Sequence, residues 1–124
     1  HKFVSLHSLR NQKQFDLVNL HGTKRSSPHF MLVIAKKFDF IATDTVDSTF
    51  LGIKVSKKLS KKACVRNKIK RRIRHLTRIM LNDNDLNLSK MAIIFIPYKG
   101  FEMIEFINLS SEFKTILLRT MSSK

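Results

Sequence analysis

The chain has 124 residues, of which 43% are apolar and ten are Phe, so it can form one folded domain over residues 1–124 and is not a disordered polypeptide. Twenty-four Lys and Arg against nine Asp and Glu give a formal charge of +15, which predicts an acidic partner, nucleic acid before an anionic membrane surface. The single Cys64 excludes an internal disulfide and a multi-cysteine zinc site; the apolar runs 31–35 and 91–96 are too short to cross a bilayer, and without an apolar signal region we expect a cytoplasmic protein.

The first half of the chain predicts one helix and two strands. Residues 11–20 include four apolar side chains, and Gly22 follows as a helix stop, which predicts a short helix. Residues 30–35 are apolar and partly β-branched and follow a turn signal at 26–28, so they predict a strand. The stretch 39–49, rich in Asp, Thr and Ser, indicates a surface loop. Apolar and other residues alternate over 50–56, which predicts a second strand. Ile53 and Val55 would face the core, and Gly52, Lys54 and Ser56 would point away from it.

The second half predicts a helix, a strand and a final helix. A basic loop at 57–62 leads into a helix over 63–81, which ends at the polar residues 82–85. Residues 91–96 are all apolar, which indicates a central strand covered on both faces and closed by Pro97. The last helix begins between 105 and 109 and presents an apolar side to the core: Leu109, Phe113, Ile116, Leu117 and Thr120. The order α-β-β-α-β-α predicts an α/β (α+β) two-layer sandwich.

The most informative segment is 54–78, which holds twelve of the twenty-four Lys and Arg residues and no acid. On a helix, its apolar residues fall within a single arc of about 80°, and they are Val65, Ile69, Ile73, Leu76 and Met80. A second flank carries an i, i+4 row of like charges, with Asn67 and Arg71 beside it: Arg66, Lys70, Arg74 and Arg78. Each like-charge pair costs a helix roughly 0.2–0.5 kcal/mol. Such a row therefore favours binding to a polyanion.

A solvated helix face is the alternative interpretation of this charge. Solvated faces usually mix both signs, whereas this segment has no acid between Asp47 and Asp83 to pair with it. The absence of local acids favours phosphate binding over simple solvation.

No catalytic or metal-binding constellation can be assembled from the sequence. The three glycines stand singly, so there is no Gly-rich phosphate loop, and the five His residues show no metal-ligand spacing. Glu102 and Glu105 lie before a helix, where acids typically interact with the helix dipole. If the protein takes part in catalysis, the sequence predicts that it does so as a helper.

The basic helix also carries a family signature. The run at 52–58 reads Gly-Ile-Lys-Val-Ser-Lys-Lys, and residues 63–74 contain Arg-Asn, two residues, Lys-Arg, two residues, Arg. This spacing, with the strand before it, closely resembles the signature of the bacterial ribonuclease P protein component. The resemblance extends to the early helix with Phe15, to His21-Gly22, to the strand around Phe30, and to the last strand and helix.

The resemblance implies a fold like the second domain of ribosomal protein S5, with a left-handed β-α-β crossover around the basic helix. It implies a subunit that assembles with a large catalytic RNA, which removes the 5′ leader from precursor tRNA. The active site and the catalytic Mg²⁺ are then expected on the RNA. We expect no catalytic residue, no metal ligand and no tightly bound cofactor on this chain, no required protein partner and no membrane.

The resemblance also assigns site residues. The expected contacts to the RNA subunit are Arg66, Asn67, Lys70, Arg71 and Arg74, extended by Lys57 and Lys58. The expected contacts to the leader, in a cleft between the early helix and the sheet, are Phe15, Met31, Val33, Lys54 and Ser56. Asn19 and Val33 stand where many relatives carry aromatics, so weaker base stacking is expected, and Lys54 replaces a small polar residue of some relatives and favours phosphate contact.

Several alternatives remain open at this point. Phe15 could be a core residue, and Met31 and Val33 could serve only sheet packing. A ribosomal-type RNA-binding protein without a processing role shares the charge and the fold family, but the intact Arg-Asn spacing favours ribonuclease P. A DNA-binding helix-turn-helix lacks the required helix before the basic one. A membrane-surface helix is disfavoured because the apolar arc has no Trp or Phe.

Overall fold

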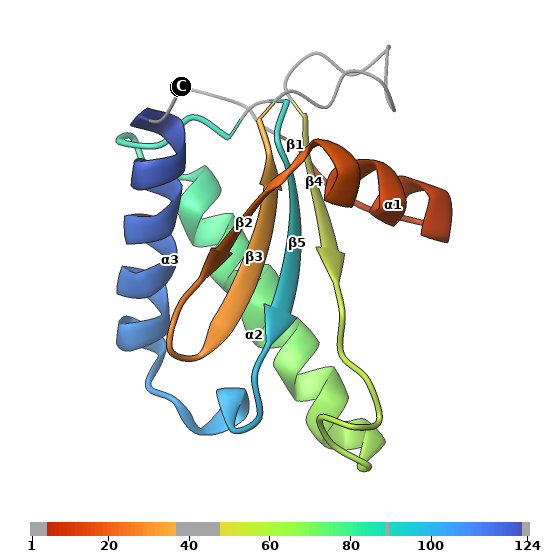
Figure 1. Ribbon diagram of the computed structural model, residues 1–124. Coiled ribbons are helices and arrows are strands. Elements are labelled where there is room, and N and C mark those ends of the chain that lie inside the picture. Colours follow the sequence, from red (N-terminus) through yellow and green to blue (C-terminus); the bar gives the residue numbers. More distant parts are fainter. Residues whose placement is uncertain (1–4, 37–47, 89, 123–124) are drawn as a thin grey trace.

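The computed structural model describes residues 5–36, 48–88 and 90–122 of the chain (Figure 1). In chain order its elements are β1 (Ser5–Ser8), α1 (Gln12–His21), β2 (Thr23–Ser26), β3 (Phe30–Ala35), β4 (Ser48–Ile53), α2 (Ala63–Leu81), β5 (Ala92–Pro97), a short 3-10 helix η1 (Phe101–Met103) and α3 (Phe106–Ser122). The predicted boundaries of α2 and β3 are confirmed residue for residue, and the predicted start of α3 is confirmed.

The five strands form one mixed sheet in the order β1-β4-β5-β3-β2. Strand β5 is the centre of the sheet, as its uninterrupted apolar sequence predicted, and it pairs parallel with β4 and antiparallel with β3. The parallel neighbours β4 and β5 are joined through α2, so α2 is the crossover helix of a β-α-β unit. The predicted α+β class is confirmed.

Two strands were missing from the predicted order. Strands β1 and β2 lie at the two edges of the sheet, β1 parallel to β4 and β2 antiparallel to β3. Both are four residues long and largely polar, reading SLHS and TKRS, so neither has the apolar alternation that identifies a half-buried strand. Backbone pairing with an apolar neighbour, rather than their own side chains, makes these segments strands.

The boundaries of β4 also differ from the prediction. The expected surface loop at 39–49 lies outside the described residues up to residue 47, but its last two residues open β4. Thr49 is buried there, and its hydroxyl donates a hydrogen bond to the Leu88 carbonyl at 2.6 Å. A Thr with a buried partner is compatible with a core strand, which sequence polarity alone could not indicate. At the other end the strand stops at Ile53, so Lys54 and Ser56 lie beyond it.

Helices α2 and α3 pack on one face of the sheet (Figure 1). Four of the five residues of the predicted arc on α2 are buried, and so is Thr77. The fifth, Val65, is partly buried against the same core. The buried residues of α3 are the five that were predicted. An aromatic cluster fills the centre of this core, with ring centroids 4.6 to 6.3 Å apart: Phe30, Phe95, Phe101 and Phe113. This is the larger of the two cores.

Helix α1 packs on the opposite face of the sheet, over a smaller apolar cluster that includes Val18, Val33 and Ile94. The Asn11 side chain caps its start by accepting the Gln14 N–H at 3.0 Å. At its end the Gly22 N–H donates to the Val18 carbonyl at 2.7 Å. A Cβ at Gly22 would lie 2.6 Å from that carbonyl oxygen and 2.8 Å from Val33 Cγ1, so the predicted helix stop is also a point of close packing onto the sheet.

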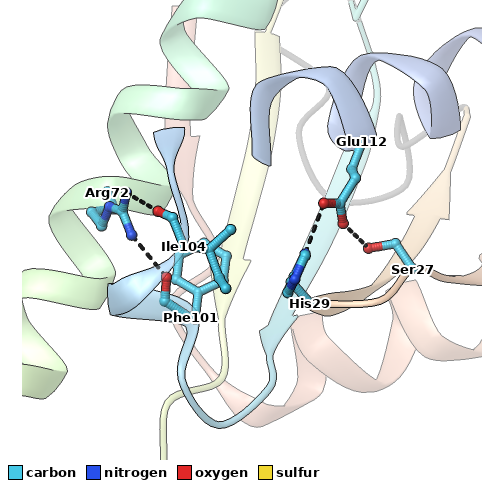
Figure 2. Close-up of polar contacts among 6 residues, drawn as sticks. All are labelled: Ser27, His29, Arg72, Phe101, Ile104 and Glu112. Atoms are coloured by element: carbon cyan, nitrogen blue, oxygen red, sulfur yellow. Dashed lines mark hydrogen bonds and ion pairs between the residues drawn. The ribbon is translucent and has the colours of Figure 1, made fainter. Parts of the chain in front are cut away.

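Polar contacts fix α3 to its surroundings. Glu112 accepts the Ser27 hydroxyl at 2.9 Å and lies 2.7 Å from His29 Nδ1, which joins α3 to the β2–β3 hairpin (Figure 2). Lys114 pairs with Asp83 at 2.9 Å and with Asp85 at 3.2 Å in the segment after α2. The hydrogen bond from Lys114 lowers the pKa of the Asp83 carboxyl, and the same contact raises the pKa of Lys114. Three acids, Asp83, Asp85 and Glu112, are therefore engaged in contacts that fix α3.

Candidate RNA interface

The first candidate surface is the exposed side of α2, which we call the α2 basic face and which comprises Arg66, Asn67, Lys70, Arg71 and Arg74 with Lys57 and Lys58 of the preceding loop. Of these, Asn67, Arg71, Arg74, Lys57 and Lys58 are exposed, and Arg66 and Lys70 are half-buried. The helix places its apolar arc against the sheet, so the opposite flank must face outward. The structure thus brings all seven predicted residues to α2 and the loop leading into it.

Two arginines of this helix have structural partners. Arg66 donates from Nη1 to the Ser60 carbonyl at 2.8 Å and so fastens the basic loop to the first turn of α2. Arg72 turns away from the α2 basic face and donates to the carbonyls of Phe101 and Ile104 (Figure 2). Its guanidinium carbon also lies 5.9 Å from the Phe101 ring centroid. Arg72 therefore holds η1 against α2 and is not part of the exposed charge.

The second candidate surface lies beside the part of the sheet that α1 leaves uncovered, and we call it the open sheet face. It comprises Phe15 of α1, Met31 of β3, and Lys54 and Ser56 just beyond the end of β4. Phe15 is half-buried at the edge of the smaller core. The Lys54 ammonium lies 5.8 Å from the centroid of the Phe15 ring, a cation–π distance. Gly52 makes room for that ring, since a Cβ there would lie 2.6 Å from Phe15 Cε2. An aromatic surface and an exposed cation are thus side by side.

The prediction for Val33 is corrected by the structure. Its side chain is only 1% exposed and belongs to the smaller core together with Val18 and Ile94. Helix α1 and Gly22 pack directly on it, so it cannot line an open surface. Met31, two residues earlier on the same strand, is not part of that core and remains partly exposed.

A groove of about 690 Å³ continues the open sheet face past the ends of β4 and β5. Lys54, Ser56 and Lys58 line it, as do three residues that the sequence analysis did not select: Ile96, Tyr98 and Lys99. The alternation of β5 carries the signal that could have identified them, because Ile94, Ile96 and Tyr98 share one face of an extended chain. Pro97 closes the predicted strand, so the sequence pattern does not extend that face to Tyr98 and Lys99.

The described residues carry little acidic chemistry. Within residues 5–36, 48–88 and 90–122, no group of three His, Cys, Asp or Glu residues could hold a metal ion. No helix in that part of the chain is long and apolar enough to cross a membrane.

Comparison with known proteins agrees with this geometry. The family model described as ribonuclease P matches residues 3–121. The ribonuclease P protein component of Rickettsia felis is 54% identical over 118 residues, which cover 95% of this chain and 100% of that protein. The corresponding protein of Rickettsia typhi is 56% identical over 114 residues, covering 92% and 97% of the two chains.

Solved structures give the same result at the level of the fold. The ribonuclease P protein from Thermotoga maritima superposes with a TM-score of 0.70 at 26% identity, covering 91% of this chain and 96% of that one. The Staphylococcus aureus protein superposes with a TM-score of 0.69 at 21% identity over 94% and 95% of the two chains, a likeness of fold. With the family signature on an exposed helix and a match over almost the whole length, the chain belongs to the ribonuclease P protein family.

Proposed function

We propose that this protein is the protein subunit of ribonuclease P, which assists a catalytic RNA in removing the 5′ leader from precursor tRNA. The observation that carries the proposal is the α2 basic face, which presents the family's Arg-Asn, Lys-Arg, Arg spacing on one exposed side of a helix. Arginine and lysine side chains on such a side bind RNA phosphates, and Asn67 adds an amide that can contact phosphate, sugar or base. We assign this face to the RNA subunit.

The open sheet face is the proposed site for the leader. A leader is single-stranded, and single strands bind where a cationic groove runs beside an aromatic surface. Phe15 supplies the aromatic ring, and Lys54 supplies the cation beside it. Met31 and Ser56 complete the proposed contacts, while Val33 supports the site from the core.

Chemistry in this proposal belongs to the RNA. Hydrolysis of the phosphodiester requires Mg²⁺, and the described residues offer no cluster that fits this ion as a protein-held cofactor. We therefore propose that the RNA subunit holds the metal and that this chain binds and positions the two RNAs. Precursor tRNA is the substrate class, and we place the protein in the bacterial cytoplasm, where that substrate is made.

The test is reconstitution with the cognate catalytic RNA at low Mg²⁺. The protein should raise the rate of 5′ cleavage of precursor tRNA above that of the RNA alone. Ile107→Ala, an exposed α3 substitution outside both candidate surfaces, serves as the matched surface control and should stimulate like the wild type. Tight binding to the catalytic RNA without any stimulation would instead favour a ribosomal-type RNA-binding role.

A further inference from the structure

Tyr98 is the only tyrosine of the chain, and it stands at the end of the groove that continues the open sheet face. Its side chain is 37% exposed, so part of the ring is covered and part is accessible. The position follows Pro97, the last residue of β5, and precedes η1. Neither the basic motif nor the core uses this ring.

The backbone and the hydroxyl of Tyr98 are both held. Its N–H donates to the His29 carbonyl at 3.0 Å, and its carbonyl accepts the Phe101 N–H at 3.1 Å. The Tyr98 hydroxyl lies 3.0 Å from the Ser26 hydroxyl on the edge strand β2, with either oxygen able to donate. A ring fixed at both ends loses little conformational entropy when a ligand packs on it.

The charge around the ring suits a phosphate backbone. Lys54, Lys58 and Lys99 line the same groove, and Ile96 adds an apolar side chain to its lining. Among the residues that the structure describes, no Asp or Glu lines this groove. Cations beside an exposed aromatic are the combination that single-stranded nucleic acids bind, because phosphates and base faces are satisfied together.

The register of the sheet places Tyr98 on the same path as Phe15. Phe15 packs at Gly52, which pairs with Ile94 across the β4–β5 ladder. Tyr98 follows Ile94 by four residues, roughly 13 Å along an extended chain. The two rings therefore stand at separate points along one face, with Lys54 between them in the groove.

We propose that Tyr98 is a second base-stacking residue, which packs against a different leader nucleotide from the one at Phe15. The assignment rests on the proposed leader site and extends it. Ser26 is then a positioning residue, because it acts by orienting the Tyr98 ring through its hydroxyl.

The first experiment uses the free protein and needs no processing activity. With one Tyr and no Trp, the tyrosine emission of this chain reports on Tyr98 alone. Titration with a single-stranded oligoribonucleotide should quench that emission, since a stacked base quenches the ring. Polyglutamate, which has charge but no bases, should leave the emission unchanged. Equal quenching by both polymers, or none by RNA, overturns the stacking contact.

The second experiment measures binding of precursor tRNA by the holoenzyme. Tyr98→Ala should raise the Kd for a long-leader precursor about 5- to 150-fold, the range for a lost base–aromatic stack. Binding of mature tRNA, which has no leader, should be affected far less, and Tyr98→Phe should restore most of the affinity because it keeps the ring. The Kd of the Ser26→Ala holoenzyme for the long-leader precursor should lie between those of Tyr98→Phe and Tyr98→Ala.

The outcomes separate this inference from the proposed function. If Tyr98→Ala binds long-leader precursor like the wild type while Phe15→Ala binds it poorly, the leader site stands and the Tyr98 assignment is wrong. If oligoribonucleotide quenches Tyr98 but the holoenzyme binds precursor and mature tRNA alike, the ring binds RNA and the leader assignment is wrong. If Tyr98→Ala and Tyr98→Phe lower the melting temperature and the affinity equally, the hydroxyl contact is structural and stacking is excluded.

Discussion

Two adjacent arginines of α2 have opposite roles, and sequence alone does not distinguish them. Arg71 is exposed on the α2 basic face, whereas Arg72 is half-buried and bonded to two main-chain carbonyls of the segment after β5. Both carry the same charge. Substituting each in turn therefore separates RNA contact from structural support without a difference in net charge.

Arg71→Ala should weaken binding to the catalytic RNA and leave the melting temperature nearly unchanged. Arg72→Ala should do the reverse and lower the free energy of unfolding by about 1.5–3 kcal/mol, because it leaves partners of a charged hydrogen-bond donor unsatisfied. Filter binding and thermal unfolding of both variants measure the two effects. Equal loss of RNA affinity in the two, with equal stability, would show that Arg72 also faces the RNA.

Phe15 packs at the edge of the smaller core and is also a proposed leader contact. Alanine substitution tests which of the two roles matters more. Phe15→Ala should weaken holoenzyme binding of precursor tRNA by about 1–3 kcal/mol, because a stacked base is lost. Binding of mature tRNA should change little, since only the precursor has a leader. A sharp drop in melting temperature with loss of both tRNA affinities and of RNA-subunit binding would mean that Phe15 is a core residue.

Gly52 offers an independent route to the same test. The added methyl group of Gly52→Ala would meet Phe15 Cε2 at 2.6 Å and Leu9 Cδ1 at 2.8 Å, both at side-chain ends that can move. The expected result is a displaced Phe15 ring in a folded protein. Gly52→Ala should then reproduce the weaker precursor binding of Phe15→Ala, measured in the same assay.

At the scale of elements, one side of α2 packs in the core and the other side is the proposed RNA contact. The position of each residue around the helix decides on which side it lies. Ile69 is 1% exposed in the centre of the larger core. Ile69→Ala should therefore lower the free energy of unfolding by roughly 2–5 kcal/mol, the range for large-to-small core substitutions. Urea unfolding monitored by circular dichroism measures this loss. A cost below 1 kcal/mol would show that α2 packs less tightly than its burial indicates.

The charge of α2 and its loop predicts the salt dependence of RNA binding. If the six cations of the α2 basic face neutralise about six phosphates, log K should fall with log[salt] at a slope of about −4 to −5. Arg71→Ala should reduce the magnitude of that slope by about 0.7–0.9, whereas Arg72→Ala should leave it unchanged. Binding measured over a salt series gives these slopes. A nearly flat dependence would place the charge outside the interface.

At the scale of the whole molecule, the protein should be inactive without RNA. The described residues form no metal cluster. Glu112 is engaged by Ser27 and His29 (Figure 2), and Asp83 is paired with Lys114. Purified protein should not release a 5′ leader from precursor tRNA at any Mg²⁺ concentration, assayed by gel electrophoresis. Leader release that survives ribonuclease treatment and repurification would contradict this division of labour.

The sequence by itself determined the class of the fold, its longest elements and its family. The buried sides of α2 and α3 are periodic patterns in the sequence, and both were confirmed because burial follows the period of a helix. The uninterrupted apolar run of β5 is also a local feature, and it correctly indicated a buried central strand. The basic signature likewise depends on spacing within one helix. Such features can be read before any tertiary contact is known.

Only the tertiary structure decided which residues pair at the edges and which side chains remain accessible. Strands β1 and β2 exist because β4 and β3 offer them backbone partners, and short polar segments carry no local sign of that. Val33 and Met31 look alike in sequence, but α1 covers only Val33. Arg71 and Arg72 differ because only Arg72 donates hydrogen bonds to main-chain carbonyls at and just after η1, some thirty residues away in the chain. Non-local packing sets exposure, and exposure decides which residues can bind RNA.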